Sequence, residues 1–120
     1  MRLTVIGIGL MGGSLALSLK KKGIVSNVIG VDHNLEHQKL ALQLGIVDEI
    51  MSLEEAVAAS DLIAIATPIN VAESLLPTIL NLVNKQVVFD LGSTKESIVN
   101  IAKAHVNKGR FVPTHPMWLT

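Results

Sequence analysis

The chain has 120 residues, a length typical of one domain, and it contains no cysteine. Lysine and arginine balance aspartate and glutamate at ten each, so there is no net field to attract nucleic acid or an anionic membrane. The absence of cysteine excludes disulfides, thiolate catalysis and cysteine-ligated metals, and it favours a cytoplasmic location. We therefore expect a small-molecule ligand and no metal.

One segment imitates a signal peptide or membrane anchor. Arg2 precedes an uncharged run at residues 3–19. That run contains four glycines, and three lysines follow it where a cleavage site would need small residues. We therefore interpret the segment as a strand, a turn and a helix of a globular domain.

Short β-branched or apolar segments alternate with longer helical patterns along the whole chain. Strands are predicted at residues 2–8, 28–32, 48–51, 62–66, 86–90 and 110–112. Helices are predicted at residues 11–22, 35–44, 70–83 and 95–107, and a further helix opens with a capping box from Ser52 to Glu55. Pro77 should kink or split the helix that contains it. The alternation predicts one α/β domain over residues 1–120, with a doubly wound, mostly parallel sheet of Rossmann type and helices on both faces.

The connection between the first strand and the first helix reads Gly-Ile-Gly-Leu-Met-Gly at residues 7–12. Gly7 permits a tight turn, Gly9 allows a pyrophosphate to approach the backbone amides, and Gly12 lets the helix pack closely on the strand. The turn therefore predicts a dinucleotide site, although a glycine turn in an unrelated α/β domain remains the alternative. The expected cofactor contacts in this turn are Gly7, Gly9, Leu10, Met11 and Gly12.

Asp32 stands at the end of the second strand, 20 residues beyond Gly12. A carboxylate at this place can accept hydrogen bonds from both hydroxyls of the adenosine ribose and would repel a 2′-phosphate. Neither His33 nor Asn34 is an arginine that could receive that phosphate. The residues favour NAD over NADP as the cofactor.

Ligands of open parallel sheets bind beyond the carboxyl ends of the strands. Thr67 and Pro68 follow the fourth strand and are expected to lie along the cofactor. Ser93 follows the fifth strand, where it either takes part in chemistry or simply caps a helix. His115 follows the sixth strand and is a candidate proton acceptor, with a purely structural hydrogen-bonding role as its alternative. We interpret the other three histidines as solvated or half-buried surface residues: His33, His37 and His105.

Five segments, in order and spacing, resemble the N-terminal domain of the prephenate dehydrogenase family, the oxidoreductases of tyrosine biosynthesis. They read IGIGLMGGSLALSLKKKG, GVD, ATPIN, DLGSTK and FVPTHPMW, and the resemblance covers essentially the whole chain. The glycine turn is shared with many dehydrogenases, whereas the Asp-x-Gly-Ser turn together with the later His-Pro is much more specific. By these motifs, Ser93 and His115 correspond to the family's serine and histidine that meet the ring hydroxyl of the substrate.

The resemblance implies NAD-dependent oxidative decarboxylation of prephenate to 4-hydroxyphenylpyruvate, with the amino analogue arogenate as another substrate. It also implies a second, helical domain, absent from this chain, that forms a homodimer interface and binds the substrate carboxylates. The isolated chain is therefore expected to be inactive. The sequence departs from the family pattern at Leu119 and Thr120, where a glycine-threonine-acid stretch is usual.

Two other functions fit part of the sequence. Another dehydrogenase with the same turn, such as a β-hydroxyacid dehydrogenase, would have its catalytic lysine in a second domain, but the Thr-His-Pro exit argues against it. A non-catalytic NAD-sensing module would need only the nucleotide-binding residues and would leave His115 without a role.

Overall fold

The structure is a computed structural model that describes residues 1–91, 100–101, 103, 105 and 108–113. The described strands are β1 (Arg2–Ile6), β2 (Asn27–Val31), β3 (Glu49–Ile50), β4 (Leu62–Ile65), β5 (Val87–Asp90) and β6 (Phe111–Pro113). The described helices are α1 (Leu10–Lys21), α2 (Leu35–Gln43), α3 (Leu53–Ala59) and α4 (Ile69–Leu82), with a 3₁₀ turn η1 (Lys108–Arg110). Most of the helix predicted at residues 95–107 lies outside the described residues.

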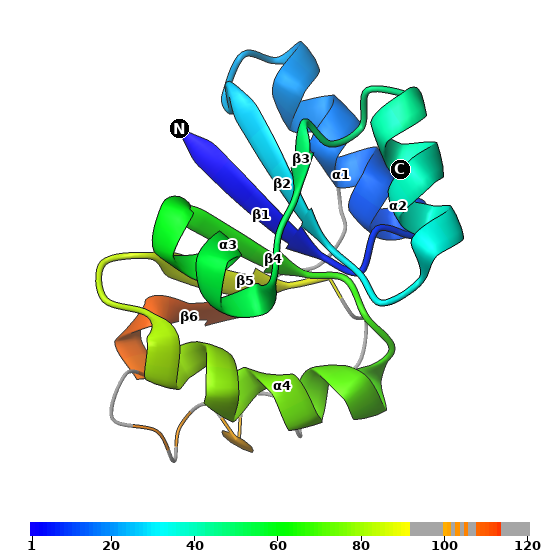
Figure 1. Ribbon diagram of the computed structural model, residues 1–120. Coiled ribbons are helices and arrows are strands. Elements are labelled where there is room, and N and C mark those ends of the chain that lie inside the picture. Colours follow the sequence, from blue (N-terminus) through cyan, green and yellow to red (C-terminus); the bar gives the residue numbers. More distant parts are fainter. Residues whose placement is uncertain (92–99, 102, 104, 106–107, 114–120) are drawn as a thin grey trace.

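The strands form a single parallel sheet in the order β3-β2-β1-β4-β5-β6 (Figure 1). The chain builds outward from β1 to β3 and then returns to place β4 on the other side of β1. Strand order therefore reverses between β1 and β4, which is where ligands bind in doubly wound sheets. The predicted α/β fold of Rossmann type is confirmed.

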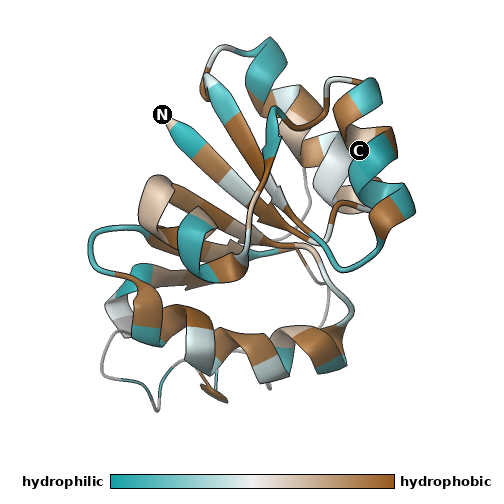
Figure 2. Cartoon of the chain, viewed as in Figure 1, coloured by the Kyte–Doolittle hydropathy of each residue, from teal (hydrophilic) through white to brown (hydrophobic). Residues whose placement is uncertain are grey.

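Helices cover both faces of the sheet and bury two separate apolar clusters. Figure 1 shows α1 and α2 on one face and α3 and α4 on the other. Successive strand residues alternate between the clusters: Leu3, Val5 and Ala64 pack toward α1 and α2, whereas Ile6 and Ile65 pack toward α3 and α4. Figure 2 shows the strands as largely hydrophobic and the loop after β2 as hydrophilic. Burial on both faces holds the strand ends, and the loops that leave them, in fixed positions.

Local signals set several of the helix ends. Gly23 and Gly45 follow α1 and α2 with φ of 73° and 71°, the left-handed conformation that glycine adopts without strain. The Ser52 hydroxyl accepts a hydrogen bond from the Glu55 amide, as the capping box predicts. The Glu55 carboxylate returns to the Ser52 hydroxyl at 2.9 Å rather than to its backbone amide. The capping interaction is thus confirmed in altered form.

Helix α4 runs from Ile69 to Leu82 as a single helix, so of the two outcomes predicted at Pro77, a kink or a split, the split does not occur. Strand β1 is also shorter than predicted, since it ends at Ile6 where the chain turns at Gly7. At 14 residues α4 is the longest described helix. Within the described part of the chain, none of the helices has the length and apolar character needed to cross a membrane.

Candidate functional site

The turn between β1 and α1 gives each of its three glycines a different environment. Gly7 has φ of 89°, which residues with a Cβ rarely adopt, and it redirects the chain out of β1. A Cβ on Gly12 would lie 2.8 Å from Val5 Cγ1 and would collide with the Gly7 carbonyl oxygen. A Cβ on Gly9 would meet no heavy atom within 4 Å. The turning and packing reasons predicted for Gly7 and Gly12 are confirmed, and the surface in front of Gly9 is open.

Helix α1 starts at this turn with its first backbone amides unshielded. Its N-cap residue is Gly9, which has no side chain to accept their hydrogen bonds, and its first turn carries no acidic residue. The first amides of a helix lack intrahelical partners and carry partial positive charge. Leu10 is 88% exposed at this place, and Met11 is half-buried beside it. An anionic group could bind here without displacing a protein side chain.

Asp32 comes directly after β2, and its carboxylate ties this loop to the glycine turn. Oδ2 accepts a hydrogen bond from the Ile8 amide at 2.9 Å, and Oδ1 accepts one from the Asn34 amide at 2.9 Å. Partial burial by itself would raise the pKa of Asp32. The two backbone hydrogen bonds and the contact with His37 outweigh burial, so the pKa is lowered overall. Asp32 therefore carries a negative charge beside the open turn at neutral pH.

A cleft of about 780 Å³ opens where the ends of β1, β2 and β4 meet the loop before α3. Asp32 and Thr67 both line it. The Thr67 hydroxyl is buried and has no hydrogen-bond partner among the described residues. Pro68 follows, exposed, as the N-cap residue of α4. Since buried polar groups are nearly always paired, the Thr67 hydroxyl indicates a place for a polar atom of a ligand.

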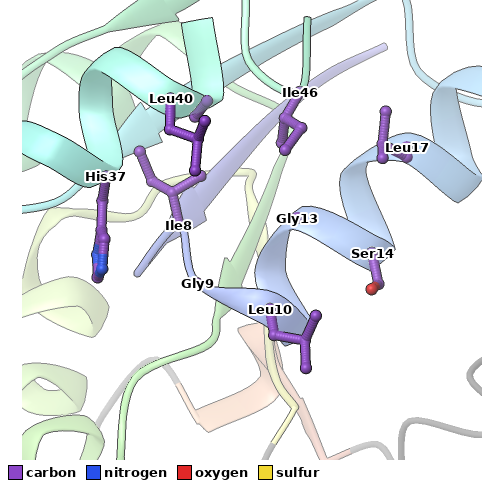
Figure 3. Close-up of a pocket in the computed structure, with 10 residues that line it drawn as sticks. Ile8, Gly9, Leu10, Gly13, Ser14, Leu17, His37, Leu40 and Ile46 are labelled. Carbon is purple, nitrogen blue, oxygen red and sulfur yellow. The ribbon is translucent and has the colours of Figure 1, made fainter. Parts of the chain in front are cut away.

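A second hollow, of about 380 Å³, lies between α1 and α2 (Figure 3). His37 is the titratable residue on its lining; the others are uncharged: Ile8, Gly9, Leu10, Gly13, Ser14, Leu17, Leu40, Ala41 and Ile46. His37 Nδ1 lies 3.2 Å from Asp32 Oδ2. An ionised carboxylate only accepts hydrogen bonds, so Nδ1 carries the proton in this contact. The pair joins the hollow to the larger cleft, which Asp32 lines.

The sequence did not reveal the partnership of His37 with Asp32. The predicted exposure of His37 is confirmed, because 49% of its side chain is accessible, but its contact with Asp32 was not expected. The available signal was the Asn34 cap: its side chain accepts hydrogen bonds from the amides of Glu36 and His37. Such a cap fixes the first turn of the helix to the loop that precedes it.

Ser93 and His115, the two predicted catalytic residues, lie outside the described residues. The strands that precede them, β5 and β6, are neighbours in the sheet, and Asp90 pairs in register with Pro113. Ser93 follows the first of these residues by three positions and His115 follows the second by two. No group of three or more His, Cys, Asp or Glu side chains suited to a metal ion occurs within the described ranges.

The family model and the curated relatives indicate one family. The family model for the nucleotide-binding domain of prephenate dehydrogenase matches residues 15–120. Prephenate dehydrogenase from Lactococcus lactis subsp. cremoris is 34% identical over 97% of this chain and 34% of its own length. The enzyme of the same name from Bacillus subtilis is 33% identical over 92% of this chain and 31% of its own. The chain thus spans about a third of the length of these curated relatives.

Solved structures show the same likeness. Prephenate dehydrogenase from A. aeolicus, in complex with hydroxyphenyl propionate and NAD+, superposes with a TM-score of 0.84 at 28% identity, over 100% of this chain and 43% of that one. Arogenate dehydrogenase from Synechocystis superposes with a TM-score of 0.78 at 27% identity, over 96% of this chain and 40% of that one.

Proposed function

The chain belongs to the prephenate dehydrogenase family as its nucleotide-binding domain, and from that premise we propose that it binds NAD for the oxidative decarboxylation of prephenate. The product would be 4-hydroxyphenylpyruvate, a precursor of tyrosine, and arogenate is the second substrate to be considered. The observation that carries the proposal is the pairing of the open, uncapped start of α1 with the ionised Asp32, joined by the Ile8 hydrogen bond of 2.9 Å.

The residues present fit a dinucleotide. We assign the pyrophosphate to the amides at the start of α1, with Gly7, Gly9 and Gly12 shaping the turn and Leu10 and Met11 flanking it. The absence of any Cβ neighbour at Gly9 supports this assignment, because a phosphate needs that space. The unpaired hydroxyl of Thr67, which lines the cleft, supports a ligand there, and we assign Pro68 to the cofactor as its exposed neighbour in the chain.

Asp32 selects NAD over NADP in this proposal. Its lowered pKa keeps the carboxylate ionised across the physiological range, so it would accept hydrogen bonds from ribose hydroxyls and repel a 2′-phosphate. Its bonds to the amides of Ile8 and Asn34 also fix the carboxylate relative to the turn, so its position is set before a ligand arrives.

We assign the substrate chemistry to Ser93 and His115 on the family motifs that they match. NAD, when bound, supplies the acceptor for a hydride. As the hydride leaves the ring carbon that carries the hydroxyl, neutral His115 accepts the hydroxyl proton. The carboxylate on the opposite carbon then departs as carbon dioxide, and the electron pair of the broken bond completes the aromatic ring. His115 returns its proton to the resulting phenolate oxygen, and Ser93 orients the imidazole or the hydroxyl.

The complete enzyme in this proposal has a second, helical domain that binds the substrate carboxylates and forms a homodimer. The lengths of the relatives support it, since the chain accounts for about a third of each. We also place the protein in the cytoplasm, consistent with a sequence that contains no cysteine.

The test is to incubate the full-length protein with prephenate and NAD and to measure NADH and carbon dioxide together. Equal amounts of both products are expected. NADH formed from a β-hydroxyacid but not from prephenate would point to the other dehydrogenase class. Binding of NAD without turnover of prephenate or arogenate would remove the catalytic assignment and leave a nucleotide-binding module.

A further inference from the structure

We propose that His37 is a second determinant of nucleotide choice, and that it makes the rejection of a 2′-phosphorylated nucleotide dependent on pH. The inference rests on the proposed binding of NAD at this site. It starts from the 3.2 Å contact between His37 Nδ1 and the carboxylate that would discriminate between the two nucleotides.

The fold holds His37 beside Asp32 through backbone interactions. Asn34 Oδ1 accepts hydrogen bonds from the amides of Glu36 at 2.9 Å and His37 at 3.1 Å, which fixes the first turn of α2. The Asn34 amide in turn donates to Asp32 Oδ1. The imidazole is therefore placed by the same loop that places the carboxylate. Figure 3 shows it beside Ile8, whose amide donates to Asp32 Oδ2, the same oxygen that His37 Nδ1 contacts.

The two ring nitrogens of His37 have different environments. Nδ1 faces the Asp32 carboxylate and must carry a proton there, while Nε2 has no hydrogen bond within the described residues. In the neutral ring, Nε2 presents a lone pair, which repels phosphate oxygens. In the protonated ring, Nε2 becomes a donor and the whole group is a cation next to a carboxylate. One proton thus turns an unfavourable neighbour of a 2′-phosphate into a favourable one.

Few other charged groups lie near enough to His37 to offset a change in the charge of its ring. The elements that line the hollow with His37 contribute uncharged residues from the β1–α1 turn, from α1 and from the loop before β3. On its own helix the charged neighbours are Glu36 and Lys39, and on the preceding loop they are Asp32 and His33. Farther away, the larger cleft is lined by two more acids, Glu54 and Glu55. Without His37, the charges on the two pocket linings are therefore predominantly negative.

The consequence is a selectivity that relaxes in acid. When the His37 ring is neutral, Asp32 acts unopposed and a 2′-phosphate is strongly rejected. When the ring is protonated, the cation offsets Asp32 and offers a hydrogen bond to the phosphate, while the uncharged ribose hydroxyls of NAD gain much less. A 2′-phosphate changes its own charge near pH 6, so its titration must be separated from that of His37 by a variant.

The experiment measures dissociation constants of NAD and NADP by calorimetry at about pH 5.5 and about pH 8, on either side of histidine titration. The quantity compared is the ratio of the NADP constant to the NAD constant, in which general effects on affinity cancel. The proteins are the unchanged protein, His37→Gln and the control His33→Gln, which removes a neighbouring imidazole from the loop that precedes α2. His37→Asn is a second variant that guards against an unstable glutamine replacement.

In the unchanged protein and in His33→Gln, the ratio should fall on acidification about tenfold more than in His37→Gln or His37→Asn. An equal fall in all proteins would overturn the inference, since the phosphate alone would then explain the pH dependence. Loss of the extra fall in His33→Gln alone would also overturn it and would move the effect to His33. Failure of the unchanged protein to bind NAD at either pH would instead overturn the proposed function.

Discussion

The polar groups at the two ends of the sheet differ in their partners. At the amino ends the charges are paired within the protein: the Arg2 guanidinium lies 3.2 Å from the Glu49 carboxylate, and the Arg2 amide donates to Asp61 at 2.9 Å. Lys20 likewise lies 3.0 Å from Asp48, whose other oxygen accepts a hydrogen bond from a backbone amide. These pairs join strands and loops to one another at this end of the sheet.

At the carboxyl ends, polar groups are held in place but left available. The first amides of α1 have no side-chain cap at Gly9, the Thr67 hydroxyl has no partner among the described residues, and His37 Nε2 is likewise unbonded there. The same backbone architecture thus produces a closed end and an open end. The contrast teaches that the position of a polar group relative to strand direction, more than its residue type, indicates whether it serves folding or binding.

The largest effect at the open end is expected from His115→Ala in the full-length enzyme. If the imidazole accepts the ring-hydroxyl proton, turnover should fall by about two to four orders of magnitude while NAD affinity stays nearly unchanged. His115→Asn should restore only part of the rate, and the acidic limb of the pH profile should flatten in both variants. Steady-state kinetics measures the turnover and its pH profile, and calorimetry measures the affinity for NAD. Near-native turnover with an unchanged acidic limb would return His115 to a structural role.

Gly12→Ala should lower the stability of the fold beneath the open end of the sheet. The new Cβ would collide with the Gly7 carbonyl oxygen and crowd Val5, so we expect a loss of about 3 kcal/mol in the free energy of unfolding. Gly13→Ala is the matched control in the same helix, because its Cβ would lie 3.5 Å from Ile46 Cδ1, an ordinary contact. Urea denaturation compares them, and equal losses would contradict the packing argument.

Asp32→Ala should weaken NAD binding by about 1 to 3 kcal/mol and narrow the difference between NAD and NADP. It also tests a pH effect on stability. The folded-state pKa of Asp32 is lowered, so its stabilising contribution is present above about pH 4 and is lost as the pH falls through the folded value. The stability deficit of the variant should therefore shrink in acid. An NADP complex tighter than the NAD complex in the unchanged protein would refute the assigned role.

Gly9→Ala separates binding from folding within the same turn. The added Cβ would have no heavy atom within 4 Å, and the φ of Gly9 is −85°, which alanine also adopts, so the fold should tolerate the substitution. The methyl group would occupy the space assigned to a phosphate, so NAD affinity should drop by about tenfold. Thermal unfolding and calorimetry on the same sample give both quantities. A drop in stability without a drop in affinity would reverse this expectation.

The smallest effect is predicted at the closed end. Glu49→Gln removes the partner of Arg2, but both side chains are more than 40% exposed, so the loss should stay below about 1 kcal/mol and should shrink at high salt. NAD affinity should not change. A measurable change in affinity would show that the two ends of the sheet are coupled.

Sequence alone was sufficient where the signal is local. The glycine spacing and the acid at the end of β2 predicted the turn and the place of Asp32, because strand, turn and helix follow one another without interruption. The parallel sheet followed from the alternation of buried strands with helices. The strand order, which places the reversal between β1 and β4, came from the structure.

Features that depend on packing could not be predicted from the sequence. Helix α4 continues through Pro77 because that residue is exposed, so the carbonyl that it leaves unpaired can be hydrated. The buried residues Leu76, Ile79 and Leu80 meanwhile hold the helix against the sheet. The partnership of His37 with Asp32 depends on where α2 starts relative to β2, which no periodicity specifies.

The buried hydroxyl of Thr67 also bears on how long the protein lasts in a cell. An unpaired buried group costs about 1 to 3 kcal/mol, and a ligand atom that pairs with it recovers this amount on top of the stabilisation that any ligand gives by mass action. Chaperones and proteases act on the unfolded fraction, which such differences change several-fold. We therefore expect cells that are short of the nucleotide to degrade this protein faster, so that cofactor supply sets the quantity of the protein as well as its occupancy.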